Sequence, residues 1–427
     1  MDIYSEMMKD VEVPKFIQLK YDIGTQKIED VKASILSELN KKGVMARVKK
    51  NARIAITAGS REIDQIVLIL RTVADEVKKA GGVPFIVPSM GSHGGADADK
   101  QTKLLENFGI TEETVGAPIF SSLETVLVGY TEDGLEVRID KYAAEADGII
   151  AIGRVKPHTS FRGKVESGLM KMLAIGLGKP FGAALCHQLG FENMGKNVWN
   201  FGNLILEKSK VLFGLAIVDN DIHQISLIEA IPSELIPERE PQLLEYAKSL
   251  IPKIPFENID MLIVEEMGKE YSGTGMDTNV TGRNFQLGDS GLNPKRLAVF
   301  DLTDHSEGNA AGISGADVIT QKFEDKIDRK SFYVNTITVR EIEGLKLPAV
   351  MPNENLAIKL CLHTLLPEKN TSEIRAVWIR NTLNLNKIYV SEGLMEEASK
   401  IAKLEESGVL QEIEFDSFGN AINMWEE

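Results

Sequence analysis

The sequence predicts an α/β fold with two α/β domains, largely parallel sheets and an active-site cleft between the domains. Short apolar runs rich in β-branched residues alternate with segments of helical periodicity, which is the pattern of parallel sheets covered by helices. The chain has 427 residues, and a single hydrophobic core usually stops growing at roughly 250–300 residues. Length and alternation together therefore favour two domains of the same class.

The first strand–helix–strand pattern starts at residue 53. The run RIAITAG (53–59) predicts a strand, and apolar residues then recur at helical spacing from Ile63 to Val77. Gly81 and Gly82 end this helix, and the following PFIVPSM predicts the next strand. Further strands are expected at 147–155, 210–219, 259–267, 296–303 and 387–394.

A proline-rich stretch divides the two predicted domains. Residues 231–258 contain five prolines and are typical of a long loop, although LLEYAKSL within them has helical character. We therefore place an N-terminal cofactor-binding and catalytic domain at 1–255 and a C-terminal α/β domain that closes over the substrate at 256–404. The tail, 405–427, is expected to pack back on the first domain.

Composition excludes several classes of function. The net charge of -15 and the pI near 5.1 argue against nucleic acid, whose binding requires an excess of Lys and Arg. Two cysteines, without CxxC spacing, support neither a disulfide framework nor a zinc site. No signal peptide and no apolar run of about 18 residues is visible, so we expect a cytoplasmic protein without membrane contact.

One segment of this acidic chain is strongly basic. Residues 154–179 carry six Lys or Arg, one carboxylate and His158. Such a local excess of positive charge predicts an anion-binding site, and nearby cations favour the neutral imidazole that a general base needs. A solvated basic loop in which His158 has no function explains the same residues.

Two further residues follow predicted strands. His93, in MGSHGG, lies just beyond a strand's carboxyl end, where open α/β sheets bind ligands, and its glycine neighbours permit close approach of a ligand. Arg61, in TAGSR, has the bidentate geometry that suits a substrate carboxylate. A surface histidine and an arginine paired with Glu62 are the alternatives without function.

Phosphate and loop contacts are expected from three more places. Ser167 and Gly168 are predicted to open a helix whose amides bind phosphate, with Lys171 facing the same pocket. Neither a Walker P-loop nor a GxGxxG dinucleotide motif is present. The glycine-rich loop 268–284 is a candidate binding loop, with Asn279 and Arg283 as the expected ligand contacts.

Five short pieces in this order, TAGSR, MGSHGG, PHTSF, SGLMK and a histidine sixteen residues after the lysine, resemble the nickel-dependent lactate racemase family. The resemblance implies an isomerase, a racemase or epimerase of a 2-hydroxy acid that uses a nickel-pincer nucleotide. Lys171 would carry the covalently attached cofactor, and His187 would be the protein's nickel ligand. His93 and His158 would be alternating general acid and base, Arg61 would hold the substrate carboxylate, and cofactor-biosynthesis enzymes would be partners.

The sequence departs from the family between the histidine and the tether. This chain has FRGKVESGLMK where the family has FSGGxK, so extra residues, including Glu166, separate His158 from Lys171. The substrate is expected to be a 2-hydroxy acid that can be larger than lactate. Two alternatives stay open: an oxidoreductase or lyase that acts on a related acid with another cofactor, and a non-catalytic protein that binds small anions. The oligomeric state is left open.

Overall fold

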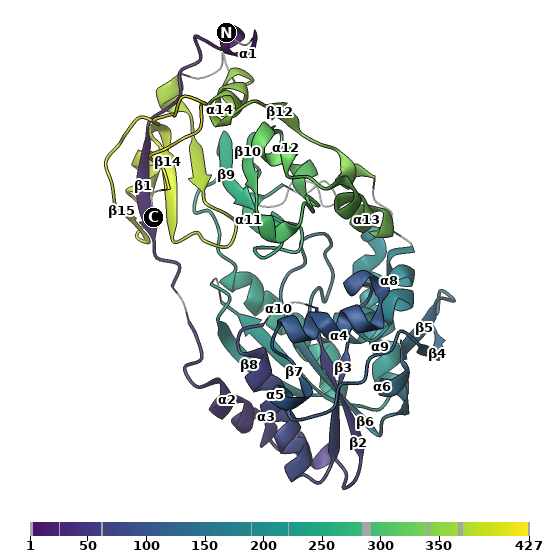
Figure 1. The fold of residues 1–427 in the computed structure, drawn as a ribbon. Coiled ribbons are helices and arrows are strands. Elements are labelled where there is room, and N and C mark those ends of the chain that lie inside the picture. The colour runs from purple at the N-terminus through teal and green to yellow at the C-terminus, as the bar shows by residue number, and fades with distance from the viewer. Residues whose placement is uncertain are drawn as a thin grey trace. The chain divides into compact units, whose positions relative to one another are not determined.

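The computed structural model describes residues 3–24, 26–60, 63–188, 190–220, 222–283, 292–339, 342–365 and 370–425 (Figure 1). The chain forms two compact units. The middle unit is Thr25–Leu250, and the two-segment unit combines Met1–Gly24 with Ile251–Glu427. The expected N-terminal domain of 1–255 differs from this division, because its first residues belong to the two-segment unit.

The middle unit alternates strands and helices as expected. Its elements are α2 (Val31–Leu39), η1 (Met45–Arg47), β2 (Arg53–Ala58), α3 (Ile66–Lys79), β3 (Val83–Pro88), η2 (Gly94–Ala96), α4 (Ala98–Asn107), α5 (Glu112–Val115), β4 (Thr125–Tyr130), β5 (Glu136–Asp140), α6 (Lys141–Glu145), β6 (Gly148–Arg154), α7 (Leu169–Lys171), η3 (Met172–Gly176), α8 (Lys179–Gln188), η4 (Phe191–Asn193), α9 (Met194–Lys208), β7 (Val211–Asp219), β8 (Ile225–Pro232), η5 (Ser233–Leu235) and α10 (Ile236–Leu250).

The main sheet of this unit has the strand order β3-β2-β6-β7-β8. Strands β3, β2, β6 and β7 are parallel, and β8 is antiparallel to β7. Strands β4 and β5 form a separate antiparallel hairpin. The predicted strands at 53–59, 147–155 and 210–219 are thus confirmed as β2, β6 and β7, and the predicted helix is α3.

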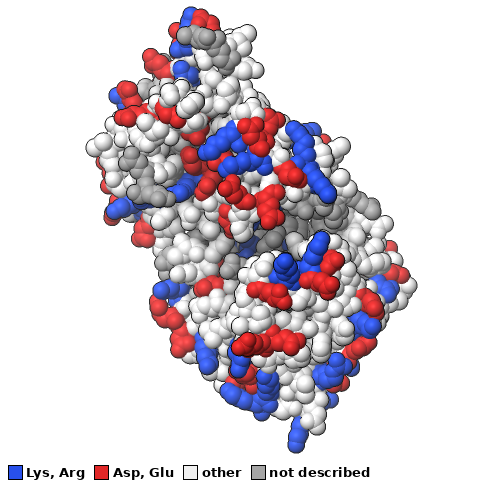
Figure 2. Space-filling view, viewed as in Figure 1, with Lys and Arg blue, Asp and Glu red and all other residues white. Residues whose placement is uncertain are grey.

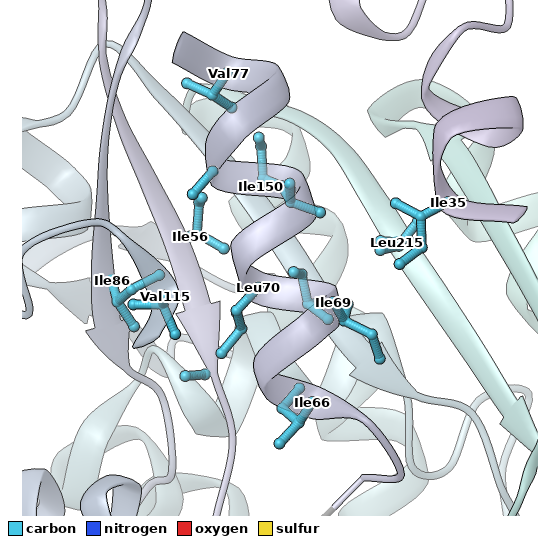
Figure 3. Close-up of a cluster of buried hydrophobic side chains, with 14 of the residues drawn as sticks. Ile35, Ile56, Ile66, Ile69, Leu70, Val77, Ile86, Val115, Ile150 and Leu215 are labelled. Carbon is cyan, nitrogen blue, oxygen red and sulfur yellow. The ribbon is translucent and has the colours of Figure 1, made fainter. Parts of the chain in front are cut away.

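Alternate residues of the buried strands enter two separate cores. Ile54 and Ile56 of β2 face a core that includes Ile69 and Leu70 of α3, whereas Ala55 faces the opposite core (Figure 3). The second core contains residues of α7, α9 and α10. Because a strand buried on both faces needs apolar side chains at every position, the continuous run of β2 is explained by this three-layer packing.

The two-segment unit contains the rest of the described elements. They are α1 (Ile3–Met7), β1 (Phe16–Tyr21), β9 (Met261–Met267), α11 (Thr278–Thr281), β10 (Arg296–Leu302), η6 (Asp304–Ser306), η7 (Ile313–Gly315), β11 (Val318–Thr320), α12 (Gln321–Asp325), α13 (Arg329–Val339), η8 (Glu343–Leu345), β12 (Ala349–Met351), α14 (Glu354–His363), η9 (Thr371–Glu373), β13 (Ala376–Ile379), β14 (Lys387–Ser391), η10 (Glu392–Leu394), α15 (Met395–Ala398) and β15 (Leu404–Glu406).

Its sheet has the order β12-β11-β10-β9-β13-β14-β1-β15. The first five strands are parallel, and β14, β1 and β15 continue the sheet in antiparallel pairs. Strand β1 therefore carries the start of the chain into this unit, between two strands from its end. Both sheets are mixed but mostly parallel and are covered by helices, so the predicted α/β class is confirmed.

The tail does not follow the expectation of packing on the N-terminal domain. Strand β15 pairs with β1, and Met424 belongs to the same core as Phe16 and Met261. The described part of 405–427 thus packs within the two-segment unit. Apolar side chains such as Met424 determine this placement, because the core that accepts them is formed by β1 and β9.

The expected proline-rich loop is mostly a helix. Helix α10 spans Ile236–Leu250 and contains Pro241. Pro237 lies in its first turn, where the missing amide hydrogen has no partner within a helix and is therefore tolerated. Leu243, Leu244 and Ala247 are buried in the second core of the middle unit, and this burial stabilises the helix despite its prolines.

Among the described residues, no single helix has the length and apolar character that crossing a membrane requires. The segments Leu169–Gly176 and Lys179–Gln188 meet that requirement only as a pair, with a bend of 105° between them. Acidic and basic side chains are interspersed over the face shown in Figure 2, on which no uniformly basic surface is visible.

Candidate functional site

The candidate site lies at the carboxyl ends of the parallel strands of the middle unit. In the strand order β3-β2-β6-β7-β8, the chain continues from β2 to its neighbour β3 in one direction and from β6 to its neighbour β7 in the opposite direction. Such a reversal of strand order opens a crevice outside the carboxyl ends, where α/β proteins bind ligands. The loops at this edge follow β2, β3 and β6, and their described residues include Ser60, His93 and His158.

His158 is held by backbone groups and by a buried carboxylate. Its own amide donates to Glu166 Oε2 at 2.7 Å, and its Nδ1 accepts the amide hydrogen of Ser160 at 3.0 Å. The ring stacks on Phe161 with a centroid distance of 4.2 Å. Glu166 is fully buried and lies 3.5 Å from both Arg162 and Lys248. These contacts fix the imidazole within the loop.

Lys171 ends the short helix α7, and the π-helical turn η3 follows directly. Its Nζ lies 5.9 Å from the centroid of the Phe161 ring. Turn η3 packs against two of the strand-end loops: a Cβ at Gly59 would lie 3.1 Å from Met172 Cε, and one at Gly91 would lie 3.1 Å from Ile175 Cγ2. Glycine at these two positions lets the loops after β2 and β3 approach the helix that carries Lys171.

Electrostatic effects show that Lys171, His158 and His187 lie near one another. Burial, and then the charge of Lys171, lower the pKa of His187 to about 4. The pKa of His158 is lowered well below its ordinary value by burial, followed by the charges of Lys171 and Lys156 and by His187. Both imidazoles are therefore neutral at physiological pH, and a neutral imidazole is the form that binds metal or accepts a proton.

His93 lies in the loop after β3. Its Nδ1 is 2.8 Å from the carbonyl oxygen of Met90 and 3.1 Å from Ser60 Oγ, which follows β2. Gln101 is fully buried and donates to the carbonyl oxygens of both Gly91 and His93 at 3.0 Å. The hydrogen bonds from Gln101 thus stabilise the loop, while His93 itself is exposed.

Ser167 and Gly168 lie at the start of α7, as expected, but a protein carboxylate occupies the place predicted for a phosphate. The amide of Met170 donates to Glu240 Oε2 at 2.9 Å, and burial raises the pKa of Glu240 to about 8 although the Met170 and Leu169 amides lower it. A Cβ at Gly168 would collide with Glu240. The Leu169 and Met170 amides thus already face a protein carboxyl group, and the assignment of Ser167 and Gly168 as cofactor contacts stays a prediction.

Sequence reasoning missed the residues that support the site. Glu240 lies in the stretch expected to be a loop, 70 positions from the amide that it accepts, and no local pattern relates the two. Arg154 was part of the basic segment, but its guanidinium pairs with Asp219 at 2.6 Å. Lys179 is fully buried and pairs with Asp140 at 3.1 Å. Two of the six cations thus neutralise buried carboxylates.

The remaining predicted site residues lie elsewhere. Arg61 is outside the described residues. Asn279 lies in α11 of the two-segment unit, and its side chain donates to Asp277 at 2.8 Å. Arg283 donates to the carbonyl oxygens of Pro294 and Lys295 and pairs with Asp317 at 2.9 Å. The contacts of Arg283 connect parts of its own unit, and its assignment as a substrate contact stays a prediction.

Within the described ranges, no group of three or more His, Cys, Asp or Glu side chains could hold a metal ion. Cys186 is adjacent to His187, but burial raises the pKa of its thiol to about 12, so the thiolate that binds metals is strongly disfavoured.

Residues 5–177 match the family model described as the lactate racemase N-terminal domain. This segment is similar to the lactate racemase N-terminal domain. The match includes His93, His158 and Lys171 and ends before His187. The resemblance to the lactate racemase family is thereby confirmed, and this domain supports a racemase-type function, which is an isomerase activity. A comparison with curated protein sequences gives no match.

Two solved structures are similar to parts of the chain. The lactate racemase apoprotein from Thermoanaerobacterium thermosaccharolyticum is 17% identical, with 71% of this chain and 73% of that chain covered and a TM-score of 0.45. A protein from Thermotoga maritima is 15% identical, with 63% and 70% covered and a TM-score of 0.47.

The residues of the middle unit fit a tethered nickel nucleotide in part. A lysine and a neutral histidine lie near one another, and they are the tether and the metal ligand that the resemblance implies. At the start of α7, the Met170 amide donates to Glu240 and is not open to a phosphate, so a phosphate at Ser167 and Gly168 would use other donors.

Proposed function

We propose that this protein is a racemase or epimerase of a 2-hydroxy acid that uses a nickel-pincer nucleotide covalently attached to Lys171. The observation that carries the proposal is the convergence of Lys171, His158 and His187 in the middle unit: Lys171 Nζ lies 5.9 Å from the Phe161 ring on which His158 stacks, and burial followed by the charge of Lys171 lowers the pKa of both imidazoles. The lactate racemase N-terminal domain supports the same reading. When bound, the nickel-pincer nucleotide supplies reversible hydride transfer at the substrate's Cα.

The chain's own residues have four tasks in this proposal. Lys171 holds the cofactor, and His187 is the protein's ligand to nickel. His93 and His158 handle the hydroxyl group of the substrate. Arg61 binds its carboxylate, with Asn279 and Arg283 as further substrate contacts. Simple removal of the Cα proton is difficult because that proton is scarcely acidic, so a site with imidazoles near a hydride acceptor suits the inversion.

The test is expression of the chain together with cofactor-biosynthesis enzymes, which we propose as its partners in the cytoplasm. Mass spectrometry of the peptide that contains Lys171 should show an adduct, and metal analysis should show nickel in the same sample. Lys164→Ala is the matched control, because Lys164 lies in the same segment but is exposed, over the ring of Trp199. Lys171→Ala should lose the adduct, and Lys164→Ala should keep it.

The same sample is then screened for inversion of 2-hydroxy acids and sugar acids. Inversion that depends on nickel supports the proposal. An unmodified Lys171 in a sample that contains the complete cofactor pathway contradicts the tether. Turnover without nickel would instead indicate an oxidoreductase or lyase with another cofactor, and binding of an acid without conversion would indicate an anion-binding protein.

A further inference from the structure

Helix α10 holds the start of the helix that carries Lys171. Glu240 Oε2 accepts the amide hydrogen of Met170 at 2.9 Å, and Met170 is the residue before Lys171 on α7. Glu240 is fully buried, and burial raises the pKa of its carboxyl group to about 8, so the group is largely neutral at pH 7. A neutral carboxyl group accepts an amide hydrogen bond in an apolar core without the cost of a buried charge. The contact therefore connects α7 to α10 without a counter-ion.

The same helix reaches the loop that carries His158 through a buried carboxylate. Glu166 Oε2 accepts the His158 amide hydrogen at 2.7 Å, and Glu166 Oε1 lies 3.5 Å from Lys248 Nζ on α10. Arg162, in the loop itself, also lies 3.5 Å from Glu166. A fully buried carboxylate is stable only with cations or hydrogen-bond donors close to it. Lys248 supplies such a charge from α10, so this helix helps to fix the backbone of His158.

Both contacts come from one side of α10. Glu240, Leu244 and Lys248 follow one another at intervals of four residues, and side chains with this spacing lie along one stripe of a helix. Leu244, between the two polar residues, is buried in the core that also contains Leu169 and Met170 of α7. One stripe of a single helix thus contacts the loop of His158 and the helix of Lys171.

The loop and α7 are also continuous along the chain. Backbone hydrogen bonds of 3.1 Å run in both directions between Lys156 and Ser167, so residues 157–166 form a closed loop. Glu166 is the last residue of this loop, and α7 follows shortly after it. A displacement of this junction would therefore move the backbone of His158 and the start of α7 together, unless α10 holds both.

We propose that α10 is the positioning element of the candidate site and fixes Lys171 and His158 relative to each other. Glu240 and Glu166 are the positioning residues, and they act through backbone amides rather than by contact with the substrate. This assignment rests on the proposed function, in which the tethered cofactor and an imidazole act on one substrate. A misplacement of about 1 Å between such groups can cost about 10²-fold in rate. Helix α10 lies outside residues 5–177, so the similarity to the family model does not imply this role.

The first test measures amide hydrogen exchange at Met170 in the full chain without cofactor. Glu240→Leu and Glu240→Gln introduce side chains of similar size, but only glutamine keeps an oxygen that accepts the amide hydrogen. The Met170 amide should exchange roughly 5–100-fold faster in Glu240→Leu, because a buried amide loses its partner, and at the original rate in Glu240→Gln. Unchanged exchange in Glu240→Leu overturns the role of Glu240. If Glu240→Leu does not fold, the Lys248 variants decide the proposal.

A second test changes the charge that α10 places near Glu166. Lys248→Met removes this cation, and Lys248→Arg keeps it. Glu245→Ala is the matched control, because Glu245 is the exposed partner of Lys248 on the same helix, at 2.8 Å. The His158 amide should exchange roughly 2–5-fold faster in Lys248→Met and at the original rate in the other two variants. The same exchange rate in all three variants overturns the connection between α10 and His158.

The third test relates these contacts to turnover in the loaded enzyme. Glu240→Leu should lower kcat for inversion by about 10–10²-fold with KM unchanged, because the substrate still binds but the reacting groups are misplaced. Glu240→Gln should restore kcat, which a general loss of stability would not predict. Equal losses of kcat in both variants overturn the positioning role. If no sample inverts any acid, the proposed function fails, while the exchange rates still decide whether α10 holds both segments.

Discussion

The two sheets of the molecule differ in the charge at the carboxyl ends of their parallel strands. In the middle unit, the loops after β3 and β6 bring imidazoles, and Lys171 follows on α7. In the two-segment unit, β9 carries Glu266 near its end, and β10 carries Asp301 near its end. The comparison teaches that one fold class supplies two different sites, and that only the cationic one suits an anionic substrate.

The charged side chains near the carboxyl ends of the two sheets also differ in their surroundings. Asp301 is paired with Lys322 at 2.8 Å and with Lys326 at 2.9 Å, so its charge is balanced by exposed or half-buried cations of its own unit. Lys171 instead acts on two neutral imidazoles. The paired carboxylate Asp301 thus serves the stability of its own unit.

The largest expected effect is on the inversion rate, which should depend on a histidine of the middle unit and not on one of the two-segment unit. His93→Asn should lower the inversion rate of the loaded enzyme by about 10²–10⁴-fold, because it removes one of the two imidazoles that handle the substrate hydroxyl. His363→Asn is the matched control, since His363 is an exposed histidine of the two-segment unit. The measurement is kcat for inversion of the acid identified by screening. A loss with His363→Asn as large as that with His93→Asn would break the comparison.

The next effect is on stability. Asp219→Ala leaves the largely buried Arg154 without its partner, and loss of one member of a buried pair typically costs about 3–5 kcal/mol. Asp133→Ala breaks a pair with Lys196 that is exposed on both sides, and no measurable change is expected. Urea unfolding measures the free energy of unfolding of both variants and of the unmodified chain. Similar losses of unfolding free energy in the two variants would show that burial does not determine how much these ion pairs stabilise the fold.

A smaller loss is expected at the start of α7. Gly168→Ala places a Cβ against the Glu240 carboxyl group, and such overpacking costs about 1–3 kcal/mol. Glu240→Ala removes the colliding group, so the double variant should be more stable than the sum of the single effects predicts. A double-mutant cycle by urea unfolding measures this coupling. Strict additivity would contradict the contact.

The smallest expected effect compares one buried carboxyl group in each unit. Burial raises the pKa of Glu240 and of Glu265 to about 8 in the folded chain, above the ordinary value of 4.5. Each group therefore stays protonated on folding and loses its proton on unfolding, so stability is highest below pH 4.5 and falls as the pH rises towards 8. Glu240→Gln and Glu265→Gln should each flatten this fall.

The measurement for these variants is Tm by circular dichroism between pH 5 and 8. We expect each glutamine variant to reduce the pH dependence by roughly a few degrees. A flattened profile for Glu265→Gln with an unchanged one for Glu240→Gln would mean that the carboxyl group beneath α7 is ionised in the folded chain.

The sequence predicted the elements whose signals are local. The strand RIAITAG and the helix after it carry their period in a short window, and the position of His93 follows from the end of a strand. Strand β1 was not predicted, because its place depends on pairing with β14 and β15 at the other end of the chain. Helix α10 was not predicted because its prolines are typical of a loop, but the burial of its leucines stabilises the helix despite them.

The site was predictable in its residue types but not in their proton states. His158 and Lys171 stand out by charge and by motif, and both converge in the structure. The amide of Ser160 and the carbonyl of Met90 are backbone groups, and no pattern of side chains indicates which ring nitrogen they face. The contact of Glu240 could not be predicted for the same reason, since its partner is a backbone amide on another helix.

Strand β1 determines the order in which the protein can be completed during synthesis. Phe16 leaves the ribosome long before its partners Ser391 and Gln411 are made. Residues 25–250 contain every strand of the middle sheet, so this sheet can close while the rest of the chain is still being translated. The unpaired edge of β1 must meanwhile be kept from other chains, which makes the N-terminal segment the aggregation hazard of the nascent protein.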